Sequence, residues 1–313
     1  MGKYLFGVDI GGTTVKLGLF DADGDLREKW EISTRKEDAG KNILPDIAHS
    51  VLDKLIEFGI RKSDCIGIGI GVPGPVKRDG TVLKCANLGW DVFNVSTVMR
   101  ELTGIPNIQV ANDANVAALG ELWKGGGKGY ENIVMVTLGT GVGGGVIVDG
   151  KILSGNQGAA GEIGHINVNP DETEVCGCGK RGCLEQYASA TGIVRLTNKI
   201  LKEDARPSKL RNLDKITAKD IFDFAKTGDV LSLEAVDLFA RYLAYALAQV
   251  AQVVDPGAFV IGGGVSKAGN IIIDSVKKYF DQNVMFALKG KAFNLAKLGN
   301  DAGIFGCAYM IIG

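Results

Sequence analysis

This sequence of 313 residues contains little proline and has almost no net charge. It has only 7 prolines, so it is not a Pro/Gly-rich linker protein, although its 45 glycines are about twice the usual share. No Gly-X-Y period accompanies these glycines, which excludes a collagen-like rod. The net charge is −1, whereas a general nucleic-acid binder would carry a basic excess.

Stretches typical of a membrane span or a signal peptide are also lacking. The longest uncharged run, residues 132–148, contains five glycines and two threonines, and the N-terminus reaches Asp9 before a signal-peptide core could form. We therefore expect a cytoplasmic protein with neither a membrane nor a nucleic acid as partner. The length and the 46% of hydrophobic residues predict two folded domains.

The glycines are clustered along the chain. Seventeen fall within residues 121–182, and further clusters lie at 7–24, 67–74 and 262–269. Glycine is costly in a folded chain unless the backbone needs a positive φ or a close approach. The clusters therefore predict loops that meet a ligand.

One pattern of strands and glycine-rich loops occurs twice, which indicates an internal duplication with a longer second copy. Residues 112–120 (NDANVAALG) also resemble residues 300–306 (NDAGIFG). The first copy predicts strands at 4–8, 15–20, 26–32, 65–72 and 108–111 and helices at 43–58 and 114–123. The second predicts strands at 133–138, 146–148 and 259–261 and helices at 184–202, 217–227, 230–254 and 301–312. Two such α/β domains imply a cleft where ligands bind.

Three glycine-rich segments are candidates for phosphate binding: Asp9–Thr14 (DIGGTT), Leu138–Gly145 (LGTGVGGG) and Ile261–Gly264 (IGGG). Glycine lets backbone N–H groups approach phosphate oxygens, threonine adds hydroxyl donors, and a carboxylate such as Asp9 can hold hydrated Mg²⁺. An ordinary β-turn is the alternative for each segment alone. Neither a P-loop nor a dinucleotide-binding motif fits the flanking residues.

Asn112 and Asp113 stand between a short predicted strand and a helix. Both residue types are favoured at helix N-caps, which is one interpretation of the pair. A carboxylate at the end of a strand that faces a cleft can also take a proton from a substrate hydroxyl, which is the other.

A metal site is predicted around His165, Cys176, Cys178 and Cys183, close to Glu162 and Glu185. Three thiols and an imidazole form the donor set of a closed, structural zinc site. Reduced surface thiols are the alternative. The remaining cysteines, Cys65, Cys85 and Cys307, are scattered and expected to be buried, and His49 is expected to be structural.

Together these motifs resemble the ROK family of repressors, open reading frames and sugar kinases, over essentially the whole chain. The family belongs to the actin-like ATPase and hexokinase superfamily. The resemblance thus implies an α/β fold of two duplicated, ribonuclease-H-like domains with a cleft between them. We expect a small domain (1–113 plus 301–313) and a large one (114–300) with a zinc loop at about 165–185. Residues 87–90, 112–121 and 138–145 are most similar to the glucokinases of Gram-positive bacteria within the family.

The resemblance also implies a role for each motif residue. Asp113 matches the catalytic base that takes the proton of the sugar 6-hydroxyl. The other sugar contacts that we expect are Gly74, Asn87, Asn112, Glu162, His165 and Glu185. ATP and its Mg²⁺ would meet Asp9, Gly11, Gly12, Thr13, Thr14, Gly139, Thr140, Gly141, Gly262, Gly263 and Gly264. The structural Zn²⁺ would be bound by His165, Cys176, Cys178 and Cys183.

The implied activity is ATP-dependent phosphorylation of glucose at its 6-hydroxyl, in glycolysis, by a homodimer. Three alternatives stay open. The sugar could be N-acetylmannosamine, fructose or allose. The chain could be a sugar-sensing repressor, although a first strand at Tyr4 leaves no room for a preceding DNA-binding region. An actin-like or chaperone ATPase shares the phosphate loops but has no reason to carry Glu162, His165 and the cysteines.

Overall fold

The structure, a computed structural model, describes residues 3–313, and its contacts divide the chain into two units. Unit 1 comprises the residues up to Glu131 together with Gly145–Gly161 and Lys297–Gly313. Unit 2 comprises Asn132–Gly144 and Glu162–Ala296. The predicted domain bounds, 1–113 plus 301–313 against 114–300, remain a prediction.

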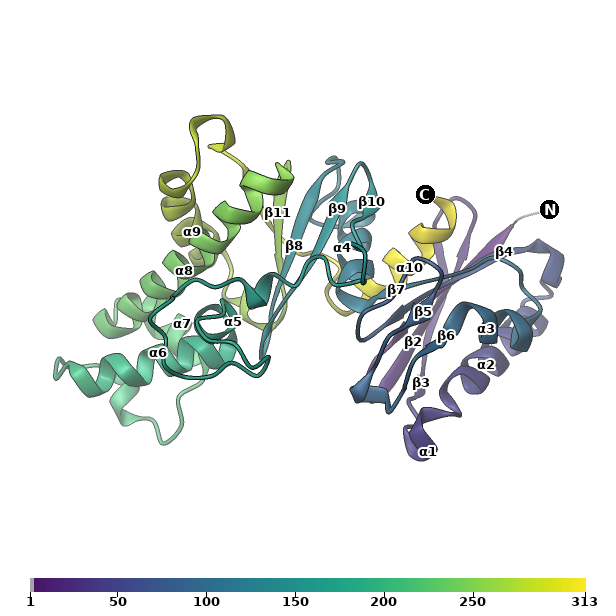
Figure 1. Cartoon of the computed structure of the whole chain (residues 1–313), viewed down its shortest axis with the longest axis horizontal. Helices are drawn as coiled ribbons and strands as arrows, with labels where there is room; N and C mark the ends of the chain where they lie inside the picture. Colours follow the sequence, from purple (N-terminus) through teal and green to yellow (C-terminus); the bar gives the residue numbers. More distant parts are fainter. Residues whose placement is uncertain (1–2) are drawn as a thin grey trace. The chain divides into compact units, whose positions relative to one another are not determined.

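Unit 1 is built on a five-stranded sheet in the order β3-β2-β1-β4-β7 (Figure 1). β1, β2 and β3 form an antiparallel meander, whereas β1, β4 and β7 run parallel. The strands are β1 (Tyr4–Ile10), β2 (Thr14–Asp21), β3 (Leu26–Ser33), β4 (Cys65–Val72) and β7 (Ile108–Asn112), with a separate ribbon of β5 (Thr81–Val82) and β6 (Phe93–Asn94).

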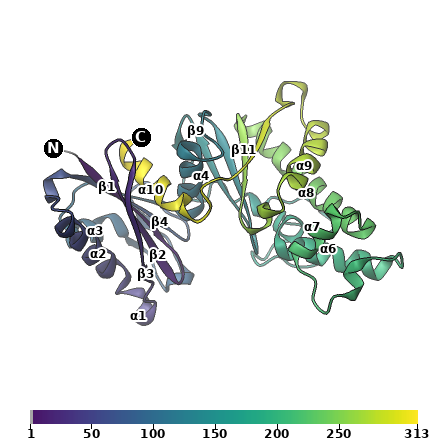
Figure 2. The same cartoon turned by 180° about the vertical axis from the view of Figure 1, so that it is seen from behind.

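Side chains that alternate along β1 pack into two different cores. Phe6 and Val8 join the core that contains Ile47 of α2, whereas Leu5 packs with Ile304 and Ala308 of α10. α2 and α3 thus lie on one face of the sheet, and α10 lies on the other (Figure 2). The helices of this unit are α1 (Glu37–Gly40), α2 (Ile43–Glu57), α3 (Val95–Thr103), α4 (Asp113–Lys124) and α10 (Ala302–Ile312).

The second five-stranded sheet repeats the strand order of the first, β10-β9-β8-β11-β12. Its strands are β8 (Ile133–Leu138), β9 (Val142–Val148), β10 (Lys151–Ile152), β11 (Ala258–Gly262) and β12 (Ala292–Leu295). Three residues, Gly11–Thr13, separate β1 from β2, and three residues, Gly139–Gly141, separate β8 from β9. The predicted duplication is confirmed, with Gly11 equivalent to Gly139.

The helices of unit 2 are α5 (Glu185–Ala188), α6 (Ala190–Glu203), α7 (Ala218–Lys226), α8 (Val230–Val254) and α9 (Asn270–Asn283). The predicted single helix at 184–202 is wrong in one respect. Ser189 has an extended backbone and accepts a hydrogen bond from the N–H of Gly192, so it ends α5 and caps α6. Among residues 3–313, none of the helices has the length and apolar character of a membrane span.

Helices α4 and α10 approach each other through glycine. A Cβ atom at Gly120 would overlap the carbonyl oxygen of Ala302, and a Cβ atom at Gly306 would overlap that of Val116. The backbones of the two helices are therefore in direct contact at these points. Larger residues at either position would force the helices apart.

We expect Gly306→Ala to destabilise unit 1 by at least about 1–3 kcal/mol, the usual cost of overpacking. The sign is informative, because the same change in an unconstrained helix interior is stabilising by about 1 kcal/mol. Urea unfolding measures the difference. The matched control is Gly12→Ala, since a Cβ atom there meets no other atom within 4 Å. Equal stability of Gly306→Ala and the wild type would contradict the contact.

Candidate functional site

In unit 1, the side chain of Asn112 connects two other predicted site residues, Gly74 and Asp113. Its side-chain oxygen caps α4 by accepting hydrogen bonds from the N–H groups of Ala114 (3.0 Å) and Asn115 (3.2 Å). Its Nδ2 donates to the carbonyl of Gly74 (3.1 Å) and to Oδ1 of Asp113 (2.9 Å). Capping and positioning are thus combined in one side chain, which orients the carboxylate of Asp113 at the positive end of the helix.

The backbone at Gly74 disfavours any residue with a side chain. Its φ is +111°, and a Cβ atom would lie 2.8 Å from the carbonyl oxygen of Lys84. The predicted sugar contact Asn87 lies near this segment, exposed in the short 3₁₀ helix Ala86–Leu88.

Asp9, near the end of β1, is the second carboxylate of this region. Burial, and then the charge of Asp113, raise the pKa of Asp9 to about 6, while Lys16 across the β-hairpin acts in the opposite direction. A carboxylate whose proton affinity is raised by a second negative charge nearby attracts a divalent cation. Asp9 is thus suited to hold Mg²⁺, directly or through water.

Each of the two equivalent glycine loops is closed by a backbone hydrogen bond, but the bond spans three residues in the first loop and two in the second. The N–H of Gly11 donates to the carbonyl of Thr14, and the N–H of Gly139 donates to that of Gly141, each at 3.0 Å. The predicted loop at 139–145 is shorter than expected, because β9 already begins at Val142. The glycines at 143 and 145 serve packing, since a Cβ atom at Gly145 would lie 2.6 Å from that of Ala118.

A pocket of about 480 Å³ in unit 2 brings two of the predicted nucleotide-binding segments together. Gly139 and Thr140 form one wall, and Gly264 with the 3₁₀ helix that it begins forms another. Gly263, with a φ of +83°, turns the chain between β11 and this helix. The remaining lining residues are Ala190, Ala218, Lys219, Phe222, Asp223, Val265, Lys267 and Ala268. An apolar wall and peptide N–H groups suit a base attached to phosphates.

His165, Cys176, Cys178 and Cys183 converge as predicted: one ligand atom from each lies within 4.8 Å of the others. The Sγ atoms of Cys178 and Cys183 are 3.6 Å apart, and that of Cys176 is 3.9 Å from Nδ1 of His165. Two sulfurs bound to one tetrahedral zinc at 2.3 Å would be about 3.8 Å apart. The donor set and its dimensions therefore fit a zinc ion.

Glu185 lies between this cluster and the Gly139–Gly141 loop. One carboxylate oxygen accepts a hydrogen bond from the N–H of Val142 (3.2 Å), and the other is 3.6 Å from Sγ of Cys176. A Cβ atom at Gly141 would overlap Glu185, which explains the glycine. Glu162 is exposed and precedes the 3₁₀ helix Ile163–His165.

Several residues near these sites have no recognisable signal in the sequence. Cys85, which the sequence shows only as one of three scattered cysteines, is buried near Gly74. Burial is the main cause that raises the pKa of its thiol, and the charge of Asp113 raises it further. Phe222 and Ala190 line the unit 2 pocket from α7 and α6. No local motif marks these residues, because only the fold brings them to the site.

Comparison with known proteins agrees with this geometry. The ROK family model matches residues 5–313. A glucokinase from Halalkalibacterium halodurans is 44% identical, over 99% of this chain and 95% of the relative. The crystal structure of a ROK family glucokinase from Streptomyces griseus, in complex with glucose and AMPPNP, has a TM-score of 0.73 at 33% identity, covering 98% of both chains. A ROK hexokinase from Thermus thermophilus has a TM-score of 0.78 at 30% identity, covering 97% of this chain and 96% of that one.

The duplicated α/β fold, the paired glycine loops and the Cys₃His cluster define the class of this protein as that of the ROK sugar kinases and repressors. The chain belongs to the ROK family.

We expect Asp9→Asn to make unit 1 more stable than the wild type above pH 6, by up to about 3 kcal/mol. A pKa that is higher in the folded than in the unfolded state means that the folded protein holds the extra proton between pH 4 and 6. The wild type therefore loses stability as pH rises through this window, and the neutral variant does not. Thermal melting at pH 4 to 8, with Asp23→Asn as the exposed control, measures the difference. A difference in melting temperature between Asp9→Asn and the wild type that does not change with pH would disprove the raised pKa of Asp9.

For the metal, we expect the purified protein to contain about one zinc ion per chain, and Cys178→Ser to lose it, since a closed site needs all four ligands. Elemental analysis of the dialysed proteins is the measurement. Cys65→Ala, which removes a buried thiol outside the cluster, should keep the zinc. A wild type without zinc would refute the metal site.

Proposed function

We propose that the protein is an ATP-dependent hexokinase that phosphorylates the 6-hydroxyl of glucose to give glucose 6-phosphate. The observation that carries this proposal is the 44% identity to a glucokinase along 99% of the chain. The geometry supports it independently, because the two units together contain a positioned carboxylate, two equivalent glycine loops and a pocket suited to a nucleotide.

We assign the general base to Asp113. Its carboxylate is held by Nδ2 of Asn112 and lies at the N-terminus of α4, whose dipole favours the ionised form that accepts a proton. As the sugar 6-hydroxyl attacks the γ-phosphoryl group, Asp113 takes its proton. Phosphoryl transfer needs such positioning more than it needs covalent catalysis.

We propose that the phosphates of the nucleotide bind at Gly11, Gly12 and Thr13 and at Gly139, Thr140 and Gly141. The adenosine then occupies the 480 Å³ pocket next to Gly264, and Gly262 and Gly263 shape its wall. Mg²⁺ bound near Asp9 would neutralise the charge that develops on the phosphates. Thr14, the first residue of β2, supports the loop that contains Gly11.

The sugar is proposed to contact Gly74, Asn87 and Asn112 in unit 1 and Glu162, His165 and Glu185 in unit 2. The zinc is structural: Nδ1 of His165 faces the cysteines, which leaves Nε2 available for a sugar hydroxyl. We further propose a cytoplasmic homodimer that acts in glycolysis.

The direct test of the activity is the formation of glucose 6-phosphate by the purified protein with ATP and Mg²⁺. A panel of N-acetylmannosamine, fructose and allose at the same concentration tests the sugar. A higher kcat/KM for one of them would replace glucose in the proposal. Specific binding to DNA without sugar phosphorylation would favour the repressor, and ATP turnover without stimulation by any sugar would favour an ATPase.

We expect Asp113→Asn to lower kcat for glucose about 10²- to 10⁴-fold, the usual contribution of a general base, with the affinity for ATP unchanged. Steady-state kinetics and nucleotide titration measure the two effects. The control is Asp53→Asn, which neutralises an exposed carboxylate on α2. Near-normal turnover of Asp113→Asn would show that another group is the base.

A further inference from the structure

Helix α6 contacts several of the functional segments of unit 2. At its N-terminus, the N–H of Ala190 donates to the carbonyl of Gly139 and Oγ1 of Thr191 donates to that of Thr140, each at 2.8 Å. The capping residue Ser189 donates to the carbonyl of Glu185 at 2.7 Å. We call residues 139–141 the nucleotide loop and residues 165–185 the cysteine loop. The start of α6 is thus hydrogen-bonded to the nucleotide loop and to Glu185, the last residue of the cysteine loop.

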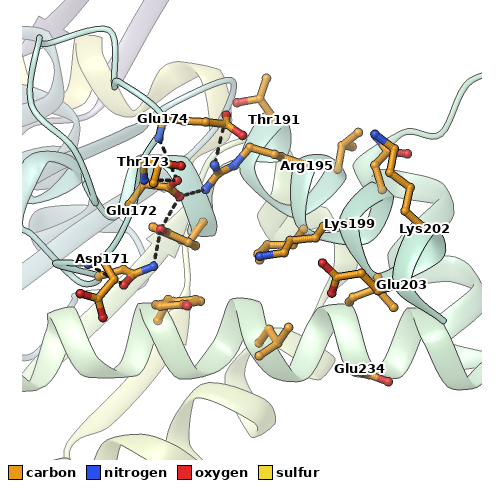
Figure 3. Close-up of a pocket in the computed structure, with 18 residues that line it drawn as sticks. Asp171, Glu172, Thr173, Glu174, Thr191, Arg195, Lys199, Lys202, Glu203 and Glu234 are labelled. Atoms are coloured by element: carbon orange, nitrogen blue, oxygen red, sulfur yellow. Dashed lines mark hydrogen bonds and ion pairs between the residues drawn. The ribbon is translucent and has the colours of Figure 1, made fainter.

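Arg195, a turn further along α6, reaches the cysteine loop (Figure 3). Its guanidinium is paired with Glu172 at 2.7 Å and with Glu174 at 3.2 Å, and its Nε donates to the carbonyl of Gln186 at 3.2 Å. The guanidinium also lies over the ring of Tyr187, 5.0 Å from its centroid. One side chain therefore contacts the segment before Cys176 and the residues directly after Glu185.

Glu172 links Arg195 to the backbone of the cysteine loop through hydrogen bonds. Its second carboxylate oxygen accepts hydrogen bonds from the N–H groups of Thr173 (2.9 Å) and Glu174 (3.0 Å). The oxygen that pairs with Arg195 also accepts from the hydroxyl of Tyr187. These partners, Arg195 first, lower the pKa of Glu172 to about 2, so the pair stays charged at neutral pH.

We propose that Arg195 is a positioning residue for the phosphoryl transfer, in that it holds the cysteine loop and Glu185 at a fixed place relative to the Gly139–Gly141 loop. The proposal rests on the proposed function. Because α6 is one rigid helix with the nucleotide loop at its start and Arg195 on its next turn, it sets the spacing between the sugar contacts and the phosphates.

The test compares Arg195→Met with Arg195→Lys in the purified, zinc-loaded protein. We expect Arg195→Met to release zinc to a chelator about 10-fold faster and to raise KM for glucose by a similar factor, as is usual for groups that support metal ligands. KM for ATP should stay within about twofold, since the N-terminal contacts of α6 are unaffected. Arg195→Lys should be intermediate, because an ammonium group cannot serve both carboxylates and the carbonyl.

Arg241→Met is the matched control. Arg241 also pairs with a carboxylate, Asp237, at 2.7 Å and lies over a tyrosine ring, that of Tyr279, at 4.9 Å, but these two partners belong to α8 and α9 and not to either loop. It should release zinc and bind glucose like the wild type. Amide exchange at Thr173 and Glu174, faster in Arg195→Met only, gives a reading that is independent of both metal and activity.

Two results would overturn the proposal. If Arg195→Met and Arg241→Met have the same rate of zinc release and the same KM for glucose, Arg195 is not a positioning residue. An equal rise of KM for ATP and for glucose would indicate general destabilisation instead. Where Arg195→Met does not fold, the same comparisons are made with Arg195→Lys. If the wild type fails to phosphorylate any sugar, the proposed function fails, while zinc release and amide exchange still test Arg195.

Discussion

The close approach of α10 to its neighbours is the constraint on which the organisation of unit 1 depends. A Cβ atom at Gly7 of β1 would overlap the carbonyl oxygen of Ile304, and one at Gly69 of β4 would overlap that of Cys307. The helix therefore lies directly on the backbone of the sheet, with α4 against it in the same manner. Since Asp9 lies near the end of β1 and α4 begins at Asp113, this packing fixes the distance between the two carboxylates to which we assign the proposed chemistry.

Glycine thus has two different uses in this chain, and only one of them can be predicted from the sequence. The loop glycines were predicted, because clusters such as 139–145 are visible locally. The packing glycines were not, because the close approach of Gly69 to Cys307 joins segments that are far apart in the chain. The two uses even mix within one cluster: Gly139 belongs to the open loop, whereas Gly145 packs against Ala118. Local composition cannot separate them, and only the pairing of distant segments does.

The same distinction explains which parts of the fold and site could be predicted. The strands with clear apolar patterns and the convergence of the Cys₃His cluster could be predicted, since each motif lies within a short stretch. The break at Ser189 was missed because residues 184–202 keep helical spacing on both sides of it. Cys85 and Phe222 were missed as site residues, because their role follows from the tertiary packing and not from their neighbours in the sequence.

The carboxylates show how surroundings decide function. Glu172 has an arginine, a tyrosine hydroxyl and two peptide N–H groups as partners, which lower its pKa to about 2, so its charge is already compensated and its role is structural. Asp9 is half-buried beside the charge of Asp113, and its pKa rises to about 6. At neutral pH the ionised Asp9 therefore lacks compensation that a bound cation would supply. Such residual instability is characteristic of groups selected for binding, because the ligand then contributes the missing stabilisation.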